Sequence, residues 1–109
     1  MKRGDVVTVA TSGDYGKPRP AIIVQTDALP EDHASVVICP LTSEVRDGVA
    51  FRVSVEPTAE NGLRLRSQVM ADKPLTVRRD RIGRKIGSLD GDQIAQLDAA
   101  LAFVMGLAD

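Results

Sequence analysis

The segment "GKPRPAIIVQT" (residues 16–26) places a cation directly in front of a short apolar run. Arg19 stands between Pro18 and Pro20, and these two prolines restrict the backbone on both sides of it. A guanidinium held in this way is a rigid fork whose donors match the oxygens of a phosphate. The segment therefore indicates a phosphate-binding arginine at the beginning of a strand.

Two hydroxyl residues end a second apolar segment, "SVVICPLTS" (35–43), in which Thr42 and Ser43 stand last. Hydroxyls at the junction of a strand and a turn often cap their own backbone, which is the simpler interpretation. If this strand pairs with the one that follows Arg19, however, Arg19 and Thr42 converge at one end of the sheet. That arrangement suits a phosphodiester.

The remaining reactive side chains predict structural roles. One histidine and one cysteine cannot form a zinc site by themselves. We expect His33, in the acidic loop "EDH", to face solvent, and Cys39, in "VVICP", to be a small core residue. The sequence has no phosphate-binding glycine motif and no G-x-S-x-G motif, so we expect neither a nucleotide fold nor a cofactor.

Length and composition fit one domain over residues 1–109, because 109 residues with 43% hydrophobic side chains can bury a core. The single cysteine fits a reducing cytoplasm. The opening "MKRGDVV" lacks the apolar region of a signal peptide, and no apolar run approaches the roughly 18 residues of a membrane span. We therefore expect a cytoplasmic protein.

Charge is unevenly distributed although the formal net charge is -1. Residues 61–88 contain eight basic and two acidic side chains. One interpretation is an ordinary solvated surface of strands and loops. The other is a local face that binds phosphate groups.

The apolar pattern predicts several short strands. We expect strands over 4–11, 19–26, 35–43 and 49–57, an alternating segment over 62–74, and a short strand with a basic turn over 75–89. Apolar residues from Ile94 onward recur at helical spacing, and Asp90 with Gln93 predicts a capping box before them. The expected fold is mainly β: a small, curled antiparallel barrel closed by one C-terminal helix.

The order and spacing of several motifs resemble the MazF/PemK toxin family over nearly the whole chain. The motifs are "KRGDVVTV", "GKPRPAIIVQ", "CPLTS", "SQVMADKPLTV" and "RIGRKIGSLD", followed by the final helix. The resemblance implies an SH3-like β-barrel homodimer that cleaves single-stranded RNA at short sequence motifs without a metal. It also implies a cognate antitoxin whose C-terminal segment covers the RNA-binding groove.

Matched by position, Arg19 corresponds to the catalytic arginine of that family. Thr42 corresponds to its catalytic threonine or serine, with Ser43 beside it. "ADKP" corresponds to a stretch where members often carry an acidic residue followed by glutamine, so Asp72 fits and Lys73 departs from the pattern. The implied reaction is attack by the RNA's own 2′-hydroxyl on the adjacent phosphorus, which leaves a 2′,3′-cyclic phosphate.

The other expected contacts with RNA follow from this assignment. Arg19 would stabilise charge, Thr42 would bind a phosphate oxygen, and Asp72 would act as a base or contact a nucleobase. Lys17, Lys73 and the basic turn over 78–85 would attract the RNA backbone. Tyr15 would either stack on a base or cover the end of the barrel.

Two alternatives remain open at this stage. A gyrase-directed binding protein of the CcdB type resembles the same fold, but that family acts through C-terminal residues that include a tryptophan. This chain has no tryptophan and ends "GLAD". A catalytically silent barrel of the same ancestry fits two other departures: Met70 where some members have arginine, and no histidine in the first loop.

Overall fold

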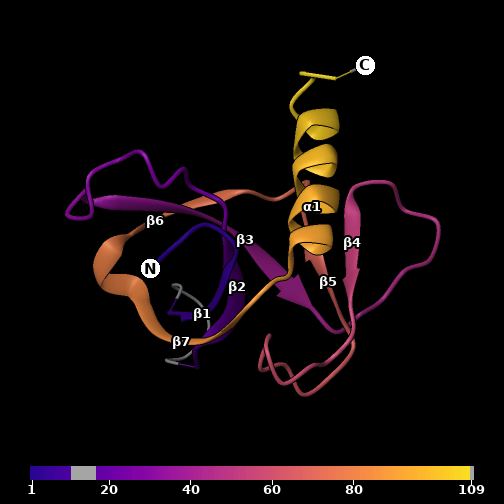
Figure 1. Ribbon diagram of the computed structural model, residues 1–109, viewed down its shortest axis with the longest axis horizontal. Helices are drawn as coiled ribbons and strands as arrows, with labels where there is room; N and C mark the ends of the chain where they lie inside the picture. Colours follow the sequence, from indigo (N-terminus) through magenta and orange to yellow (C-terminus); the bar gives the residue numbers. More distant parts are fainter. Residues whose placement is uncertain (11–16, 109) are drawn as a thin grey trace.

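The computed structural model describes residues 1–10 and 17–108 (Figure 1). Its elements, in chain order, are β1 (Asp5–Val9), β2 (Arg19–Ile23), β3 (Ser35–Thr42), β4 (Arg52–Val55), β5 (Ser67–Met70), β6 (Leu75–Arg78), the 3₁₀ turn η1 (Arg79–Arg81), β7 (Ile82–Ser88) and α1 (Gly91–Val104). The strands are short and rich in β-branched residues, which fit a pleated, half-buried surface.

The described strands form one curled antiparallel sheet in the order β4-β5-β3-β2-β1-β7, with β6 paired to β3. The ends of this path, β4 and β7, do not pair with each other in the described part of the chain. Instead, the loop after β4 reaches β7, where the Ser88 N–H donates to the Glu60 carbonyl at 2.9 Å. The predicted mainly β, barrel-like fold with a C-terminal helix is thus confirmed, and a loop completes the curl.

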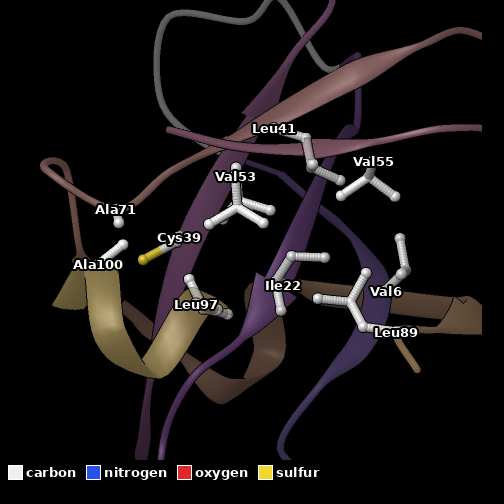
Figure 2. Packing of buried hydrophobic residues seen from close by; sticks show 11 residues of the cluster. Val6, Ile22, Cys39, Leu41, Val53, Val55, Ala71, Leu89, Leu97 and Ala100 are labelled. Carbon is white, nitrogen blue, oxygen red and sulfur yellow. The ribbon is translucent and has the colours of Figure 1, made fainter. Parts of the chain in front are cut away.

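Successive residues of β1, β2 and β3 belong alternately to two buried clusters, because neighbouring side chains in a strand point to opposite faces. One cluster consists of Val7, Val9, Ala21, Ile23, Val36 and Ile38. The other contains Val6, Ile22, Cys39 and Leu41 and is covered by α1 and by β4 and β5. Figure 2 shows Leu97 and Ala100 of α1 pointing toward Cys39 and Ile22. Both faces of the central strands are therefore buried.

The helix begins at the predicted capping box. The Asp90 side chain accepts from the Gln93 N–H at 2.8 Å, and the Gln93 side chain accepts from the Asp90 N–H at 3.0 Å. These bonds satisfy two backbone donors that the first turn leaves unpaired. Within the described residues, no helix is long and apolar enough to cross a membrane.

The segment 75–89 differs from the expectation of one short strand and a basic turn. It contains two strands, β6 and β7, separated by η1. The second strand was missed because Gly83 and Gly87 interrupt its alternation and Arg84 and Lys85 are exposed. Pairing with β1 forms this strand despite its weak local pattern, since tertiary contacts override propensity.

Leu97 should be the main anchor of the helix, because it is 1% exposed in the cluster that joins α1 to the sheet. We expect Leu97→Ala to lower the free energy of unfolding by about 2–5 kcal/mol through lost burial and a cavity. Urea unfolding would measure this change. Leu65→Ala, at a side chain that is 64% exposed, is the matched control and should leave the unfolding midpoint nearly unchanged.

Candidate functional site

The beginning of β2 and the end of β3 bring Arg19 and Thr42 together. The antiparallel ladder between these strands pairs Ala21 with Pro40. Continued by two residues, the same register sets Arg19 opposite Thr42, and both side chains line one groove. Pro20 has no N–H to donate, so the ladder stops short of this position. The convergence expected from pairing of these two strands is present.

The Thr42 hydroxyl is oriented by the backbone that follows it. Its Oγ1 atom accepts from the Glu44 N–H at 3.1 Å, which confirms the capping interpretation. A hydroxyl that accepts one hydrogen bond still has its own proton to donate. The capping bond and a contact from Thr42 to a phosphate oxygen are therefore compatible.

The groove that contains this pair has a volume of about 970 Å³. One wall is formed by the ends of β2 and β3, and the other by the loop before β5 together with β7. Its described lining is Thr8, Pro18, Arg19, Pro20, Leu41, Thr42, Ser43, Glu44, Gly62, Leu63, Arg64, Leu65, Ser67, Arg84, Lys85 and Ile86. A groove open to solvent with basic side chains on both walls suits an extended anionic chain.

A buried asparagine holds the loop wall in place. Asn61 is 1% exposed, and its Oδ1 atom accepts from the N–H groups of Thr58 and Leu63, both at 3.0 Å. Its Nδ2 atom donates to the Glu56 carbonyl at 2.8 Å. Gly62 follows with φ +68°, and a Cβ there would collide with the Ile86 carbonyl on β7. The hydrogen bonds of the Asn61 amide and the close approach of Gly62 to Ile86 thus fix the loop against β7.

An irregularity in β7 sets the position of Arg84. The pairing of β1 with β7 shifts register between Val7, which faces Lys85, and Val9, which faces Ile82. At this shift the Thr8 Oγ1 atom accepts from the Arg84 N–H at 3.1 Å. Bulges of this kind redirect a side chain, and here Arg84 lines the groove.

The basic segment 61–88 fits both predicted interpretations in part: some of its cations line the groove, and others lie on the solvated surface. Arg64, Arg84 and Lys85 line the groove. Other cations of the segment make contacts at the surface, outside the groove. Three of them form ion pairs: Arg66 with Glu56 at 2.8 Å, Lys73 with Asp72 at 3.4 Å, and Arg78 with Asp80 at 2.5 Å. Arg79 Nε donates to the His33 carbonyl at 2.6 Å. Only part of the positive charge of this segment therefore faces the groove.

The other predicted contact residues are not all in the groove. Ser43 lines it, whereas Lys17 is exposed but is not part of its described lining. Asp72 and Lys73 follow the far end of β5, whose near end pairs Gln68 with Thr42. The prediction for Tyr15 lies outside the described residues.

Two charged lining residues, Glu44 and Arg64, had no assigned role from sequence, whereas Arg84 and Lys85 belong to the basic turn over 78–85 that was expected to attract the RNA backbone. The charge of segment 61–88 was the available signal for Arg64. For Glu44, the only indication of a place in the groove was its position directly after "LTS" in the sequence.

The two residues expected to be inert are placed as predicted. His33 is exposed, and Cys39 is fully buried in the core. Burial raises the pKa of the Cys39 thiol to about 11. Among the described residues, no three His, Cys, Asp or Glu side chains gather in a group that could hold a metal ion.

Comparison with known proteins identifies relatives along the whole chain. Residues 2–105 match the family described as PemK-like, MazF-like toxin of type II toxin-antitoxin system. The "Probable endoribonuclease MazF" of Mycolicibacterium smegmatis is 38% identical over 109 residues, covering 99% of each chain.

Two solved structures are similar in fold. An endoribonuclease in complex with its cognate antitoxin, from a mycobacterial species, superposes with a TM-score of 0.83 at 26% identity, covering 100% of this chain and 98% of that one. The Mycobacterium tuberculosis toxin MazF-mt6 superposes with a TM-score of 0.82 at 28% identity, covering 96% and 99%.

The buried thiol gives a direct test of the assignment of Cys39 to the core. Because burial raises the pKa of Cys39 to about 11, we expect native protein at pH 8 to resist iodoacetamide, with alkylation slower by at least about a hundredfold than in unfolded protein. Mass spectrometry would measure the modification. Since the folded pKa is raised, the thiol's contribution to stability is complete at neutral pH and is lost as the pH rises toward 11. Rapid alkylation of native protein would contradict the assignment of Cys39 to the core.

Proposed function

Because the chain belongs to the PemK-like, MazF-like toxin family of type II toxin–antitoxin systems, we propose that it is a metal-independent endoribonuclease toxin. Its substrate is single-stranded RNA, including mRNA, cut at a short sequence motif. Cleavage of mRNA would stop translation and growth. The observation that carries the proposal is the alignment of Arg19 with Thr42 in a groove whose other wall bears Arg64, Arg84 and Lys85.

The proposed chemistry uses a nucleophile that belongs to the substrate. The ribose 2′-hydroxyl loses its proton to solvent and attacks the adjacent phosphorus, an O2′–P bond forms, the P–O5′ bond breaks, and the departing O5′ takes up a proton from solvent. The products are a 2′,3′-cyclic phosphate and a 5′-hydroxyl. The protein then has to supply only positioning and stabilisation of negative charge.

Arg19 and Thr42 have separate tasks in this reaction. Arg19 stabilises the charge on the pentavalent phosphorus through the hydrogen-bond donors of its planar fork. Thr42 donates its hydroxyl proton to a phosphate oxygen, while the Glu44 N–H holds its Oγ1 atom. Ser43 lies beside them in the same lining and contacts the RNA backbone.

The remaining contacts extend along the RNA strand. Arg64, Arg84 and Lys85 attract phosphates on the far wall. Tyr15 and Lys17, which precede Arg19 in sequence, contact a base and the backbone. Asp72 and Lys73 lie outside the groove, so we assign both to contacts with a flanking nucleotide. Asp72 is therefore not assigned as the general base.

We also propose a two-fold homodimer and a cognate antitoxin in the cytoplasm. The end of α1 exposes apolar side chains that a partner copy would cover: Phe103 is 53% exposed, Met105 is 62% exposed and Leu107 is 78% exposed. A mycobacterial structural neighbour was solved with its cognate antitoxin. A basic groove would attract an acidic antitoxin segment that excludes RNA.

Substitutions at the aligned pair test the assignment of roles. We expect Arg19→Ala to lower the cleavage rate by about a hundredfold to a thousandfold, as loss of one oxyanion donor does. Arg19→Lys should restore little activity, because a point charge cannot replace the fork. Thr42→Val keeps the shape of the side chain and should also slow cleavage without unfolding the protein. Single-turnover cleavage of a long RNA would measure these rates.

His33→Ala is the matched control, since His33 is exposed and lies outside the groove lining. Its cleavage rate should stay near that of the unchanged protein. Wild-type rates for both Arg19→Ala and Thr42→Val would overturn the assignment. A protein that cuts no RNA but poisons gyrase, or does neither, would favour the CcdB-like or the catalytically silent alternative.

A modified substrate tests the origin of the nucleophile. An RNA with a single 2′-deoxy sugar before the scissile phosphate should resist cleavage at that position only, because it lacks the attacking oxygen. Gel mapping of the cut ends should show 2′,3′-cyclic phosphates, and EDTA should leave the rate unchanged. Efficient cutting of the deoxy substrate, or loss of activity in EDTA, would indicate an activated water instead.

A further inference from the structure

The buried side chain of Gln68 lies next to Thr42 in the sheet, and it is only 2% exposed. On β5 it pairs with Thr42 of β3 on one side and with Ser54 of β4 on the other. Its Oε1 atom accepts from the Arg46 N–H at 3.0 Å and from Arg52 Nη1 at 3.4 Å. Its Nε2 atom donates to the Arg46 carbonyl at 3.1 Å and to the Ser54 hydroxyl at 3.1 Å. Both amide atoms thus use their full hydrogen-bonding capacity.

A short chain of hydrogen bonds connects this amide to the Thr42 hydroxyl. Arg52 Nη1, which donates to Gln68, also donates to the Glu44 carbonyl at 3.1 Å. The Glu44 N–H in turn donates to Thr42 Oγ1 at 3.1 Å. The backbone of residue 44 is therefore held on both sides, by Arg52 at its carbonyl and by Thr42 at its N–H.

Thr42 depends on this support because one edge of its strand lacks a ladder partner. The pairing of β3 with β2 ends at Ala21 and Pro40, so the last two residues of β3 are paired only with β5. The chain then leaves the sheet, and Gln68 holds the backbone of Arg46 through two hydrogen bonds. Small displacements of a reacting group lower rates steeply, so the end of β3 needs an anchor.

The network is a costly way to fill an interior position. Arg52 Nε is buried and has no hydrogen-bond partner among the described residues. A buried polar atom without a partner destabilises the fold, whereas apolar side chains of similar shape would fill the same space without that cost. Stability alone therefore does not explain why a glutamine and an arginine meet beneath the Thr42 turn.

We infer that Gln68 and Arg52 are positioning residues that fix the Thr42 hydroxyl in its working orientation. This inference rests on the proposed function, which places Thr42 at the scissile phosphate. Neither residue is part of the described groove lining, so their effect reaches the RNA through Glu44 and Thr42. They act on the rate of the chemical step and not on RNA affinity.

Three variants break the chain of bonds at different points. Gln68→Leu removes the whole amide network, Gln68→Glu removes only the two bonds donated by Nε2, and Arg52→Met removes the link to the Glu44 carbonyl. For each, we expect kcat for RNA cleavage to fall by roughly tenfold to a hundredfold, the cost of a misplaced reacting group, while KM changes less than about threefold. If Gln68→Leu does not fold, Gln68→Glu and Arg52→Met still decide the question.

Gln25→Leu is the matched control, because Gln25 anchors the opposite end of the same strand. Its Oε1 atom accepts from the Val37 N–H at 3.2 Å, and its Nε2 atom donates to the Ser35 carbonyl at 3.2 Å. Its removal should lower the unfolding temperature and leave kcat unchanged. An equal fall of kcat in Gln25→Leu would show a general loss of stability and would overturn the inference.

The double variant Thr42→Val/Gln68→Glu separates this inference from the proposed function. If Gln68 acts through Thr42, the double variant should be no slower than Thr42→Val alone. If the losses of kcat in the two single variants multiply in the double variant, the positioning role alone is overturned. The same holds if Thr42→Val lowers kcat while Gln68→Glu and Arg52→Met keep the kcat of the unchanged protein. A Thr42→Val protein with the unchanged rate would instead overturn the role of Thr42 in the proposed function, and the positioning role with it.

Discussion

The structure depends on one strand, β3, which pairs with three others. Its first half pairs with β6, its second half pairs with β5 on the same edge, and its other edge pairs with β2. Because both of its faces are buried, its register is strongly specified: a slip by one residue would exchange the two core clusters. The position of Thr42 relative to Arg19 is therefore fixed by the packing of Val36, Ile38 and Cys39, all of which lie away from the groove.

The site lies where regular hydrogen bonding stops. Pro20 ends the ladder between β2 and β3, so beside the groove β2 pairs only with β1 and β3 pairs only with β5. Two buried side-chain amides provide hydrogen bonds to the backbone where the ladder does not. Gln68 lies beneath one wall of the groove and Asn61 beneath the other. Each amide bonds to backbone groups of a neighbouring segment, so hydrogen bonds hold two irregular segments in place. The apolar core thus fixes the strands that carry Arg19 and Thr42, and buried polar side chains fix the irregular segments beside them.

The sequence predicted the parts of the site that local chemistry determines. The two prolines around Arg19 and the turn after Thr42 follow from residue type, and strand pairing then brings the two residues together. It did not predict that the charge of segment 61–88 would divide, since the partners of these cations lie far away in the sequence. Arg79 donates to the His33 carbonyl, and Lys85, which also lines the groove, pairs with Asp5 of β1 at 3.3 Å. Gln68 also gave no signal, because a glutamine within a short strand has the same local pattern whether it faces solvent or a buried backbone. Those assignments require the three-dimensional neighbours of each residue.

A site of this kind selects its substrate by backbone geometry. In the proposed reaction the ribose O2′, the phosphorus and the departing O5′ must lie in line, and a duplex holds each ribose in an A-form geometry that does not present them so. A single strand can turn at one linkage, and a groove with cations on two walls can stabilise that turn by binding the phosphates on either side. Arg19, on the wall formed by β2 and β3, would then meet the phosphate at the bend. In the proposed reaction, the same walls that attract RNA would therefore also favour the conformation in which its own hydroxyl can attack.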